Sequence, residues 1–451
     1  MDSVLPVTVA VSLIVGALIA FLIFGSYFRK RKSEVESIAK PEKLQANQNL
    51  SQKQPLKTNK KSQSKIHSHS HAADKEANKR HHPLDLNTLK GHGDAVTGLC
   101  FSTDGRNLAT ACGDGVLRVF KLDDVANKSF KFLRINLPAG AHPTAVAYAD
   151  DATSVVVATH TLSGSSLHMY GEEKPKATGE SKQQTKLPLP EIKWEHKKVH
   201  DKRVILTLVG TKATYGGADG STVIVSCSEG TDITLWHGKT GKVLGHVDTN
   251  QLKNTMATVS PNGRFIAAAA FTADVKVWEI VYTKDGSVKE VSKVMQLKGH
   301  KSAVTWLCFA PNSEQLILTH CPLWDGSIRV WNMLFVCSFE VRYHLDEELK
   351  TLKVFPIPLH DANGTTLHYD RLCLSPDGKI LAAIHGSTLQ WLSAESGQVL
   401  ETAERAHDGD ITDMAWSPTP IQSGDKKLSV LATASIDKKV KLWVAPMLHP
   451  S

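Results

Sequence analysis

The sequence lacks the short motifs that mark the commoner enzyme classes. It contains no Gly-rich phosphate loop, no G-x-S-x-G nucleophile motif and no H-E-x-x-H zinc motif. No C-x-x-C pair occurs among its seven cysteines, which stand at positions 100, 112, 227, 308, 321, 337 and 373. That scatter favours buried free thiols over a disulfide framework or a zinc site. We therefore predict a protein that is not an enzyme, with no cofactor and no small-molecule substrate.

No charged side chain occurs between residues 4 and 28. A helix of this length, at about 1.5 Å per residue, would cross a hydrocarbon core of roughly 30 Å. A cleaved signal peptide would more usually have a basic start and a shorter apolar core. Because flanking cations stay preferentially in the cytosol, we predict a single-pass anchor with a lumenal N-terminus and a cytosolic remainder. The cations that follow the run are Arg29, Lys30, Arg31 and Lys32.

Residues 29–83 differ in composition from the rest of the chain. They hold 14 Lys and Arg against 5 Asp and Glu, whereas the rest of the chain holds 39 against 40. The segment has almost no aromatic or branched apolar residues, so it cannot bury enough surface to offset the entropy lost on ordering. We predict a disordered basic linker that either lies along anionic headgroups or acts as a solvated spacer. We predict no metal site in this linker, because no folded framework would hold its histidines in place. These histidines stand at positions 67, 69, 71, 81 and 82.

Seven short alternating runs that end in an aromatic residue recur after residue 84. Their spacings, from 42 to 66 residues, predict a unit of roughly 40 to 45 residues that carries loop insertions. Most units contain a turn such as "SPNG" or "SPDG" between two apolar segments, which is typical of antiparallel hairpins. Residues 84–446 show no sustained helical periodicity, which excludes a parallel α/β fold. The aromatic residues are Phe120, Tyr170, Trp236, Trp278, Trp331, Trp391 and Trp443.

These units resemble WD40 repeats. "LKGH" occurs at residues 89–92 and again at 297–300, and "RAH" occurs at 405–407. The resemblance implies an all-β fold, a seven-bladed WD40 β-propeller over residues 84–446 in which four-stranded sheets surround a central channel. Residues 447–451 would form a short tail. Such a propeller would usually bind other proteins.

The WD40 resemblance also implies a buried hydrogen-bond tetrad of His, Ser or Thr, Asp and Trp in some blades. We interpret these residues as structural, because a fully satisfied buried network makes a blade rigid. The seventh unit carries all four members, His407, Ser435, Asp437 and Trp443. The first keeps His92 and Asp114 but has Cys112 and Phe120 in the Ser and Trp positions. The fifth keeps His300, Asp325 and Trp331.

The last unit leaves little room for a fourth strand, because Pro446 and Pro450 follow Trp443 closely. Residues 83–91 precede the innermost strand of the first unit and are free to supply the missing strand. We therefore predict that the two ends of the propeller pair in one sheet, which would remove an exposed sheet edge.

Residues 249–280, "TNQLKNTMATVSPNGRFIAAAAFTADVKVWEI", resemble the most recognisable blade of the transducin beta-like family of membrane-anchored WD40 proteins. The order of span, basic linker and propeller is also similar. The resemblance implies the endoplasmic reticulum membrane, with the propeller in the cytosol. It further implies a protein scaffold whose partners include a stress-responsive kinase or the translation machinery.

An alternative interpretation is a propeller that acts as a small-GTPase exchange factor in trafficking at the endoplasmic reticulum. Proteins of that kind are anchored near the C-terminus, whereas the uncharged run of this chain lies at its N-terminus. We expect no specific nucleic-acid partner, because the propeller is about neutral and the cations are concentrated in the linker. The expected partners are proteins, which the sequence does not identify.

Overall fold

The computed structural model describes residues 82–150, 154–171, 190–320, 327–333, 351–358 and 367–448. The predicted membrane span, the four cations after it and almost all of the linker lie outside these residues. Among the residues that are described, no helix is long and apolar enough to cross a membrane. The span and its orientation therefore stay predictions.

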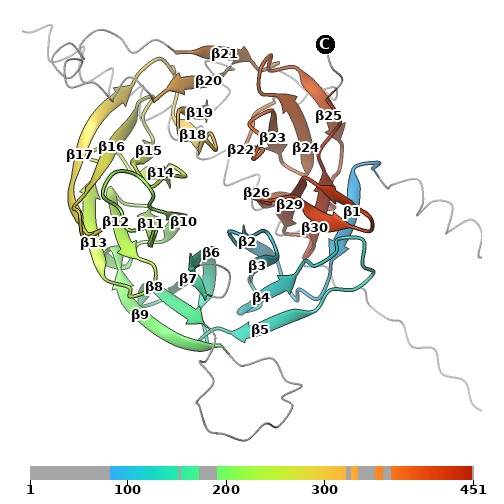
Figure 1. Ribbon diagram of the computed structural model, residues 1–451, viewed down its shortest axis with the longest axis horizontal. Coiled ribbons are helices and arrows are strands. Elements are labelled where there is room, and N and C mark those ends of the chain that lie inside the picture. Colours follow the sequence, from blue (N-terminus) through green and yellow to red (C-terminus); the bar gives the residue numbers. More distant parts are fainter. Residues whose placement is uncertain are drawn as a thin grey trace, which may run out of the picture. The chain divides into compact units, whose positions relative to one another are not determined.

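The described residues form seven four-stranded antiparallel sheets, which are arranged as blades around a ring (Figure 1). This confirms the predicted all-β, seven-bladed propeller. In six blades, four consecutive strands pair in chain order from the inner strand to the outer one. Each inner strand contacts the inner strands of both neighbouring blades, so the ring is closed.

The strands of the first three blades have the following bounds. Blade 1 comprises β2 (Val96–Phe101), β3 (Asn107–Cys112), β4 (Val116–Lys121) and β5 (Phe132–Asn136). Blade 2 comprises β6 (His142–Asp150), β7 (Ser154–Thr161), β8 (Gly164–Gly171) and β9 (Glu191–Val199). After one 3-10 turn, η2 (His200–Lys202), blade 3 comprises β10 (Ile205–Lys212), β11 (Thr222–Ser228), β12 (Asp232–His237) and β13 (Val243–Asp248).

The remaining blades continue in the same way. Blade 4 comprises β14 (Asn254–Val259), β15 (Phe265–Ala270), β16 (Val275–Tyr282) and β17 (Val288–Leu297). Blade 5 comprises β18 (Val304–Phe309), β19 (Gln315–His320), β20 (Ser327–Asn332) and β21 (Lys353–Pro356). Blade 6 comprises β22 (Arg371–Leu374), β23 (Ile380–His385), β24 (Thr388–Ser393) and β25 (Val399–Ala403).

Blade 7 is built from both ends of the domain. Its inner strands are β26 (Ile411–Trp416), β29 (Val430–Ser435) and β30 (Val440–Val444), with a small hairpin of β27 (Ile421–Ser423) and β28 (Lys426–Leu428) between the first two. Its outer strand is β1 (Asp85–Leu89), which pairs antiparallel with β30 and is drawn in blue beside the red strands of Figure 1. This confirms the predicted closure.

The packing between blades follows from the alternation of side chains along each strand. Seven clusters of buried apolar side chains, counted among the described residues, lie one at each junction between neighbouring blades. Every residue of β15 is buried. Since successive side chains of a strand point to opposite faces, Ile266 and Ala268 pack toward blade 3, whereas Ala267 and Ala269 pack toward blade 5.

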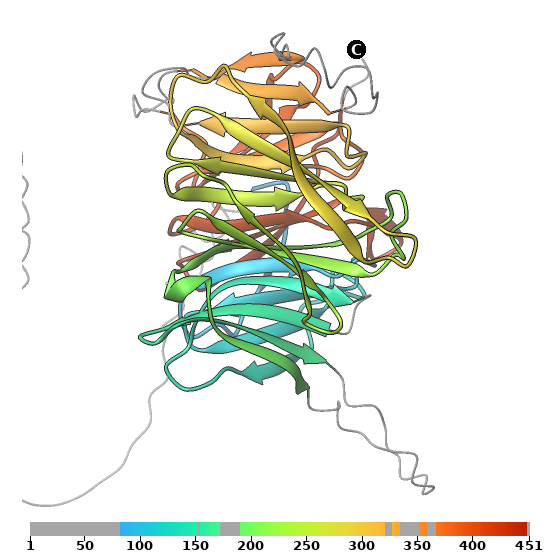
Figure 2. The ribbon, with the colours of Figure 1, turned by 90° about the vertical axis from the view of Figure 1, so that its left-hand side faces the viewer.

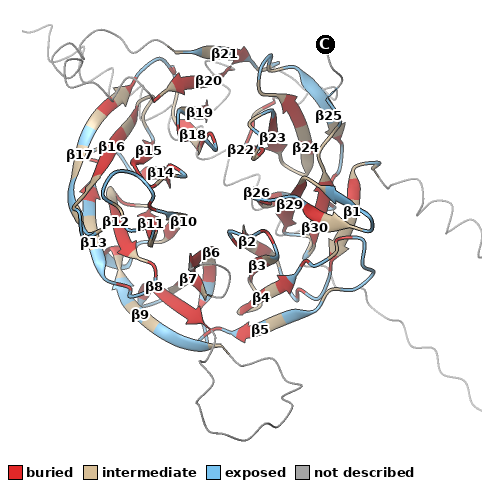
Figure 3. Ribbon diagram, viewed as in Figure 1, coloured by how far each residue is buried: buried red, intermediate tan, exposed pale blue. Residues whose placement is uncertain are grey.

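Exposure increases from the middle of each blade to its rim. The recurring aromatic residues all lie on the third strand of their blade and are buried, as in Phe120 of β4 and Trp443 of β30. Figure 3 shows long exposed stretches on the outer strands β9, β13, β17 and β25. In the side view of Figure 2, the long outer strand β17 runs obliquely across the edge of the ring.

His82 requires a correction to the predicted linker. We assigned this residue to the disordered segment, but its ring stacks on Trp391 with 6.0 Å between ring centroids. The His82 ring also packs edge-on against Trp443, with 6.1 Å between the ring centroids. Packing against the propeller core therefore begins before β1. The composition of the linker does not reveal this contact, because it depends on the single aromatic ring of His82.

Five of the seven cysteines lie among the described residues, and all five are free thiols, as predicted. Burial raises the pKa of Cys100 and Cys373 to about 11 and that of Cys227 to about 12. A thiol with a raised pKa is a poor nucleophile and a poor metal ligand. These cysteines therefore act as packing residues.

Candidate functional site at the channel mouth

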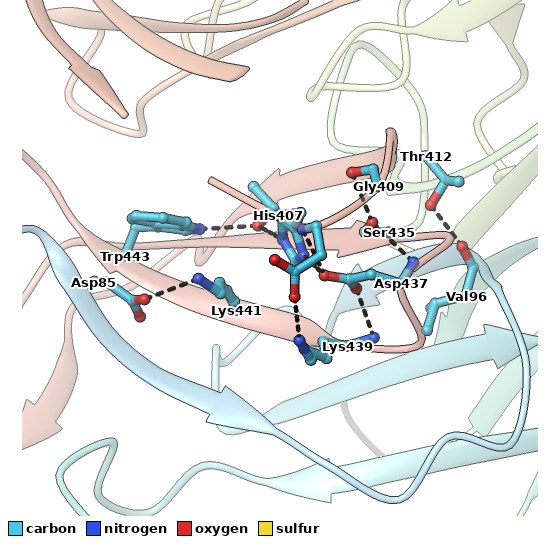
Figure 4. A network of polar contacts seen from close by, with 12 residues as sticks. Asp85, Val96, His407, Gly409, Thr412, Ser435, Asp437, Lys439, Lys441 and Trp443 are labelled. Atoms are coloured by element: carbon cyan, nitrogen blue, oxygen red, sulfur yellow. Dashed lines mark hydrogen bonds and ion pairs between the residues drawn. The ribbon is translucent and has the colours of Figure 1, made fainter. Parts of the chain in front are cut away.

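One mouth of the central channel is marked by threonines at the start of the inner strands. Thr97, Thr255 and Thr412 each lie at an irregularity in strand pairing, just after the first residue of the strand. Each hydroxyl donates to a backbone carbonyl of the next blade, on Pro143, Val304 and Val96 respectively. These hydrogen bonds join the inner strands of blades 1 and 2, 4 and 5, and 7 and 1, and Figure 4 shows the one from Thr412.

In blade 6 the inner strand begins with an arginine, Arg371. The guanidinium carbon of Arg371 lies 4.3 Å from the ring centroid of Trp306 in blade 5. A cation in this position over an indole is attracted by the negative face of the ring. The indole Nε1 of Trp306 in turn donates to the carbonyl of Leu372, at 2.9 Å. Blades 5 and 6 are thus held together by two contacts at the mouth.

Asp413 continues this chain of contacts into blades 7 and 1. Its Oδ1 lies 3.5 Å from Nη1 of Arg371, and its Oδ2 accepts the backbone N–H of Leu99 in blade 1 at 2.9 Å. Burial raises the pKa of this carboxyl, while the Arg371 guanidinium opposes that shift. The arrangement orients Arg371 from two sides before any partner binds.

A hollow of about 490 Å³ opens at this mouth. Aromatic and arginine side chains are the residues that most often dominate binding energy in protein interfaces. The hollow offers one of each, both held by neighbours, so little side-chain entropy would be lost on binding. Its lining residues are Thr97, Thr305, Trp306, Asp370, Arg371, Ile411 and Thr412.

The tetrad of blade 7 lies nearby, and one of its predicted members is wrong. Nε2 of His407 lies 2.8 Å from the hydroxyl of Thr433, and Nε1 of Trp443 donates to that same hydroxyl at 2.8 Å. Nδ1 of His407 lies 3.0 Å from the carboxylate of Asp437. The hydroxyl member of this tetrad is therefore Thr433.

Ser435, the residue that we predicted in that place, has a different role. It lies on the same face of β29 but two residues farther along, and its hydroxyl donates to the carbonyl of Gly409. It also accepts the backbone N–H of Asp437, which stabilises the turn into β30. The register explains the error: Leu431 pairs with Trp443, so the next side chain on that face, at 433, reaches the indole.

The hydrogen bonds of the tetrad also determine its charges. Although burial opposes ionisation, the hydrogen bond from His407 lowers the pKa of Asp437 to about 2. The Asp437 carboxylate is therefore ionised at neutral pH. An ionised acceptor favours the tautomer in which Nδ1–H of His407 donates to Asp437 and Nε2 accepts from Thr433.

Blade 3 contains a second complete tetrad, which we did not predict. His200 contacts the hydroxyl of Ser226 through Nε2 at 2.8 Å and the carboxylate of Asp232 through Nδ1. Nε1 of Trp236 donates to Ser226 at 2.8 Å. We missed it because Asp232 precedes its Trp by four residues, not six. A signal that could have found this tetrad is a Ser or Thr ten residues before the Trp. Ser226 precedes Trp236 by ten residues, just as Thr433 precedes Trp443.

Blade 1 keeps more of its network than we predicted. Cys112 is not in the hydroxyl position, since Nε2 of His92 lies 2.9 Å from the hydroxyl of Thr110, ten residues before Phe120. Asp114 is present but pairs with Nη2 of Arg118 at 2.6 Å. Burial and the positive charge of Arg118 lower the pKa of His92 to about 4. The histidine is therefore neutral at pH 7.

Blade 5 holds only part of a tetrad in the region that the structure describes. His300 and Trp331 are buried, as expected of structural members, whereas Asp325 lies outside the described residues. Because Leu316 pairs with Trp331, the next position on that face is Leu318, which has no hydroxyl. Nε1 of Trp331 accordingly lacks a hydrogen-bond partner among the described residues.

Three segments of the chain match the family described as "WD domain, G-beta repeat": residues 85–121, 291–332 and 397–444. The chain contains WD40 repeats. Each match begins with an outer strand (β1, the end of β17, or β25) and continues through the three inner strands of the next blade. Each sequence repeat thus begins with the outer strand of one blade and ends with the third strand of the next. Because the first repeat begins with β1, this strand is left to complete blade 7 and close the ring of this WD40 propeller.

The chain is similar to transducin beta-like protein 2 of two mammals. It is 29% identical to the Homo sapiens protein over 338 residues, which is 75% of this chain and 68% of that protein. It is 28% identical to the Mus musculus protein over 363 residues, or 80% of this chain and 75% of that one. Together with the WD40 repeats of this chain, this similarity suggests a protein-interaction scaffold.

Proposed function

We propose that this chain is a membrane-tethered, non-catalytic WD40 scaffold that binds protein partners through the channel mouth. The observation that carries the proposal is the hollow lined by Trp306 and Arg371, both fixed by contacts across blades 5, 6 and 7. A rigid surface with an aromatic and an arginine anchor can bind a protruding peptide segment with small entropic loss.

The tether is part of the proposal because of the uncharged run at residues 4–28 and the cations at 29–32. A span with this charge pattern would leave the propeller in the cytosol. Its attachment to the membrane through a flexible linker would raise its effective concentration near membrane-bound partners to the millimolar order. We propose the endoplasmic reticulum as the membrane, with a stress-responsive kinase or the translation machinery as partner, as the resemblance implies.

Topology is the first test, because an exposed glycosylation acceptor lies in the propeller. Asn127, in the pattern "NKS", is exposed on blade 1 and would be modified only in the lumen. The full chain, with an Asn-x-Thr tag fused before Met1, would be expressed in cells and its microsomes digested with protease. We expect a glycan on the tag alone and a propeller open to protease. A glycan at Asn127 on a protected propeller would overturn the orientation.

Partner binding is tested by filling the hollow. Thr305 lines it, whereas Thr211, near the far end of inner strand β10, is partly exposed and makes one hydrogen bond to a neighbouring blade. We expect Thr305→Arg to reduce the recovery of cross-linked partners at least tenfold, and Thr211→Arg to leave it unchanged. Equal losses in the two variants, or none, would place the binding surface elsewhere.

A further inference from the structure

Three side chains with metal-binding atoms lie together on blade 6, beside the channel mouth. His368 and Asp370 precede β22, and His385 is the last residue of β23. One ligand atom from each residue lies within 4.8 Å of the other two. All three are partly exposed, so an ion could reach them from solvent.

The contacts within the cluster already bring the donors together. Nε2 of His368 lies 3.0 Å from Oδ1 of Asp370. The ring centroids of His368 and His385 are 4.8 Å apart, and the two ring planes meet at 79°. Oδ2 of Asp370 accepts the backbone N–H of Gly386 at 2.9 Å. The turn that follows His385 therefore orients the carboxylate, as second-sphere hydrogen bonds do in metal sites.

Blade 6 differs from blades 3 and 7 in the partners of its histidines. In those blades Nδ1 of the tetrad histidine lies against an aspartate and Nε2 against a hydroxyl. In blade 6, Nδ1 of His385 is buried with no hydrogen-bond partner among the described residues. This nitrogen is therefore available to an ion held between the three side chains.

We propose that His368, Asp370 and His385 bind a divalent transition-metal ion, for which zinc is the best match. Two imidazoles and one carboxylate form a donor set that zinc uses, whereas magnesium and calcium prefer oxygen donors alone. Zinc ligands at about 2.0 to 2.2 Å from the metal lie roughly 3.5 Å from one another. Side-chain rotations that bring the donors roughly 1 Å closer would complete the site.

Three protein donors leave one position of a four-coordinate zinc ion open. Asp370 also lines the hollow at the channel mouth, so the ion would lie at its edge and add positive charge next to Arg371. A carboxylate, histidine or cysteine of a bound segment has the chemistry to fill the open position. Metal binding itself is measured on this chain alone and does not depend on the proposed scaffold function.

The experiment must first remove a competing source of metal binding, the linker histidines. The full chain in detergent, with His67, His69 and His71 replaced by Gln, serves as the background. Equilibrium dialysis against Co²⁺ and absorption spectroscopy then give stoichiometry and geometry. We expect one equivalent of Co²⁺, a tetrahedral or five-coordinate d–d spectrum, and displacement of the band by Zn²⁺.

Variants in this background distinguish the site from adventitious binding. His385→Asn, His368→Asn and Asp370→Asn should each weaken Co²⁺ binding at least tenfold and change the spectrum. His246→Gln, at an exposed histidine of β13 in blade 3, is the matched control and should change neither. Thermal unfolding without metal checks that each variant is folded. No bound equivalent in the background, or unchanged binding in folded His385→Asn and Asp370→Asn, would overturn the proposal.

Discussion

Asp85 lies opposite Trp443, so the first strand of the propeller pairs with its last. The strand pair continues through Leu89, which is almost fully buried in the cluster between blades 7 and 1. Closure therefore combines a backbone ladder with a buried apolar side chain. Both contributions are lost together when β1 is removed.

Deletion of residues 84–89 is predicted to destabilise the whole propeller. The backbone hydrogen bonds are worth about 1 kcal/mol each, and burial of Leu89 about 1.5 to 3 kcal/mol. We expect a loss of at least several kcal/mol, seen as a much lower melting temperature or as insolubility. Deletion of residues 61–66, of the same length, is the control. If both deletions melt like the intact chain, closure through β1 is not needed for stability.

Thr433→Val is predicted to cost more stability than Ser435→Ala. The first change leaves Nε2 of His407 and Nε1 of Trp443 buried without their shared partner, at about 1 to 3 kcal/mol each. The second removes only turn hydrogen bonds, at about 1 kcal/mol or less. Urea unfolding of the two variants, with Thr433→Ser as the conservative control, measures the difference. The opposite order would restore Ser435 as the tetrad member.

His92 is predicted to make stability depend on pH between about 4 and 6.5. Its pKa is about 4 in the folded protein and 6.5 in the unfolded chain, so the unfolded state binds the proton first as pH falls. The stabilisation is complete above pH 6.5 and is lost toward pH 4, by at most about 1.4 kcal/mol per pH unit. Thermal unfolding at pH 7 and pH 5 should show a smaller change for His92→Gln than for the parent chain. An equal change in both would exclude His92 as the cause.

Arg371 and Asp413 are predicted to be energetically coupled. Arg371→Met leaves a partly buried carboxylate without its cation, whereas Arg371→Met with Asp413→Asn removes both charges. A double-mutant cycle by urea unfolding should give a coupling of at least about 0.5 to 1 kcal/mol. Because burial raises the pKa of Asp413, the single Arg371 variant should lose stability as pH rises above about 4. Strictly additive effects would show that the 3.5 Å contact contributes nothing.

The blades could be predicted from the sequence because their signals are local. Each aromatic residue closes a short alternating run, and the structure places every one of them on the third strand of a blade, from Phe120 to Trp443. Closure could be predicted because the last unit had one strand too few. Both inferences rest on the order of segments along the chain and require no atomic detail.

The tetrads show where such reasoning ends. Thr433 and Ser435 are both hydroxyl residues on one face of β29, and only the pairing of Leu431 with Trp443 decides which of them meets the indole. In blade 3 the aspartate comes from the first residue of β12, Asp232, and a fixed spacing does not reveal it.

The channel mouth could not be predicted at all. Trp306, Arg371 and Asp413 lie far apart in the sequence, and the curvature of the ring brings them together. Contacts of this kind depend on how blades pack, which no local pattern encodes.

The closing strand also has a consequence for synthesis. A ribosome makes β1 before any blade and makes its partner β30 only several hundred residues later. At roughly 5 to 20 residues per second, this delay is on the order of tens of seconds. During that time Leu89 and the unpaired edge of β1 are available to other nascent chains. We expect the newly made chain to depend on chaperones until its last strand emerges, even though the finished ring is closed.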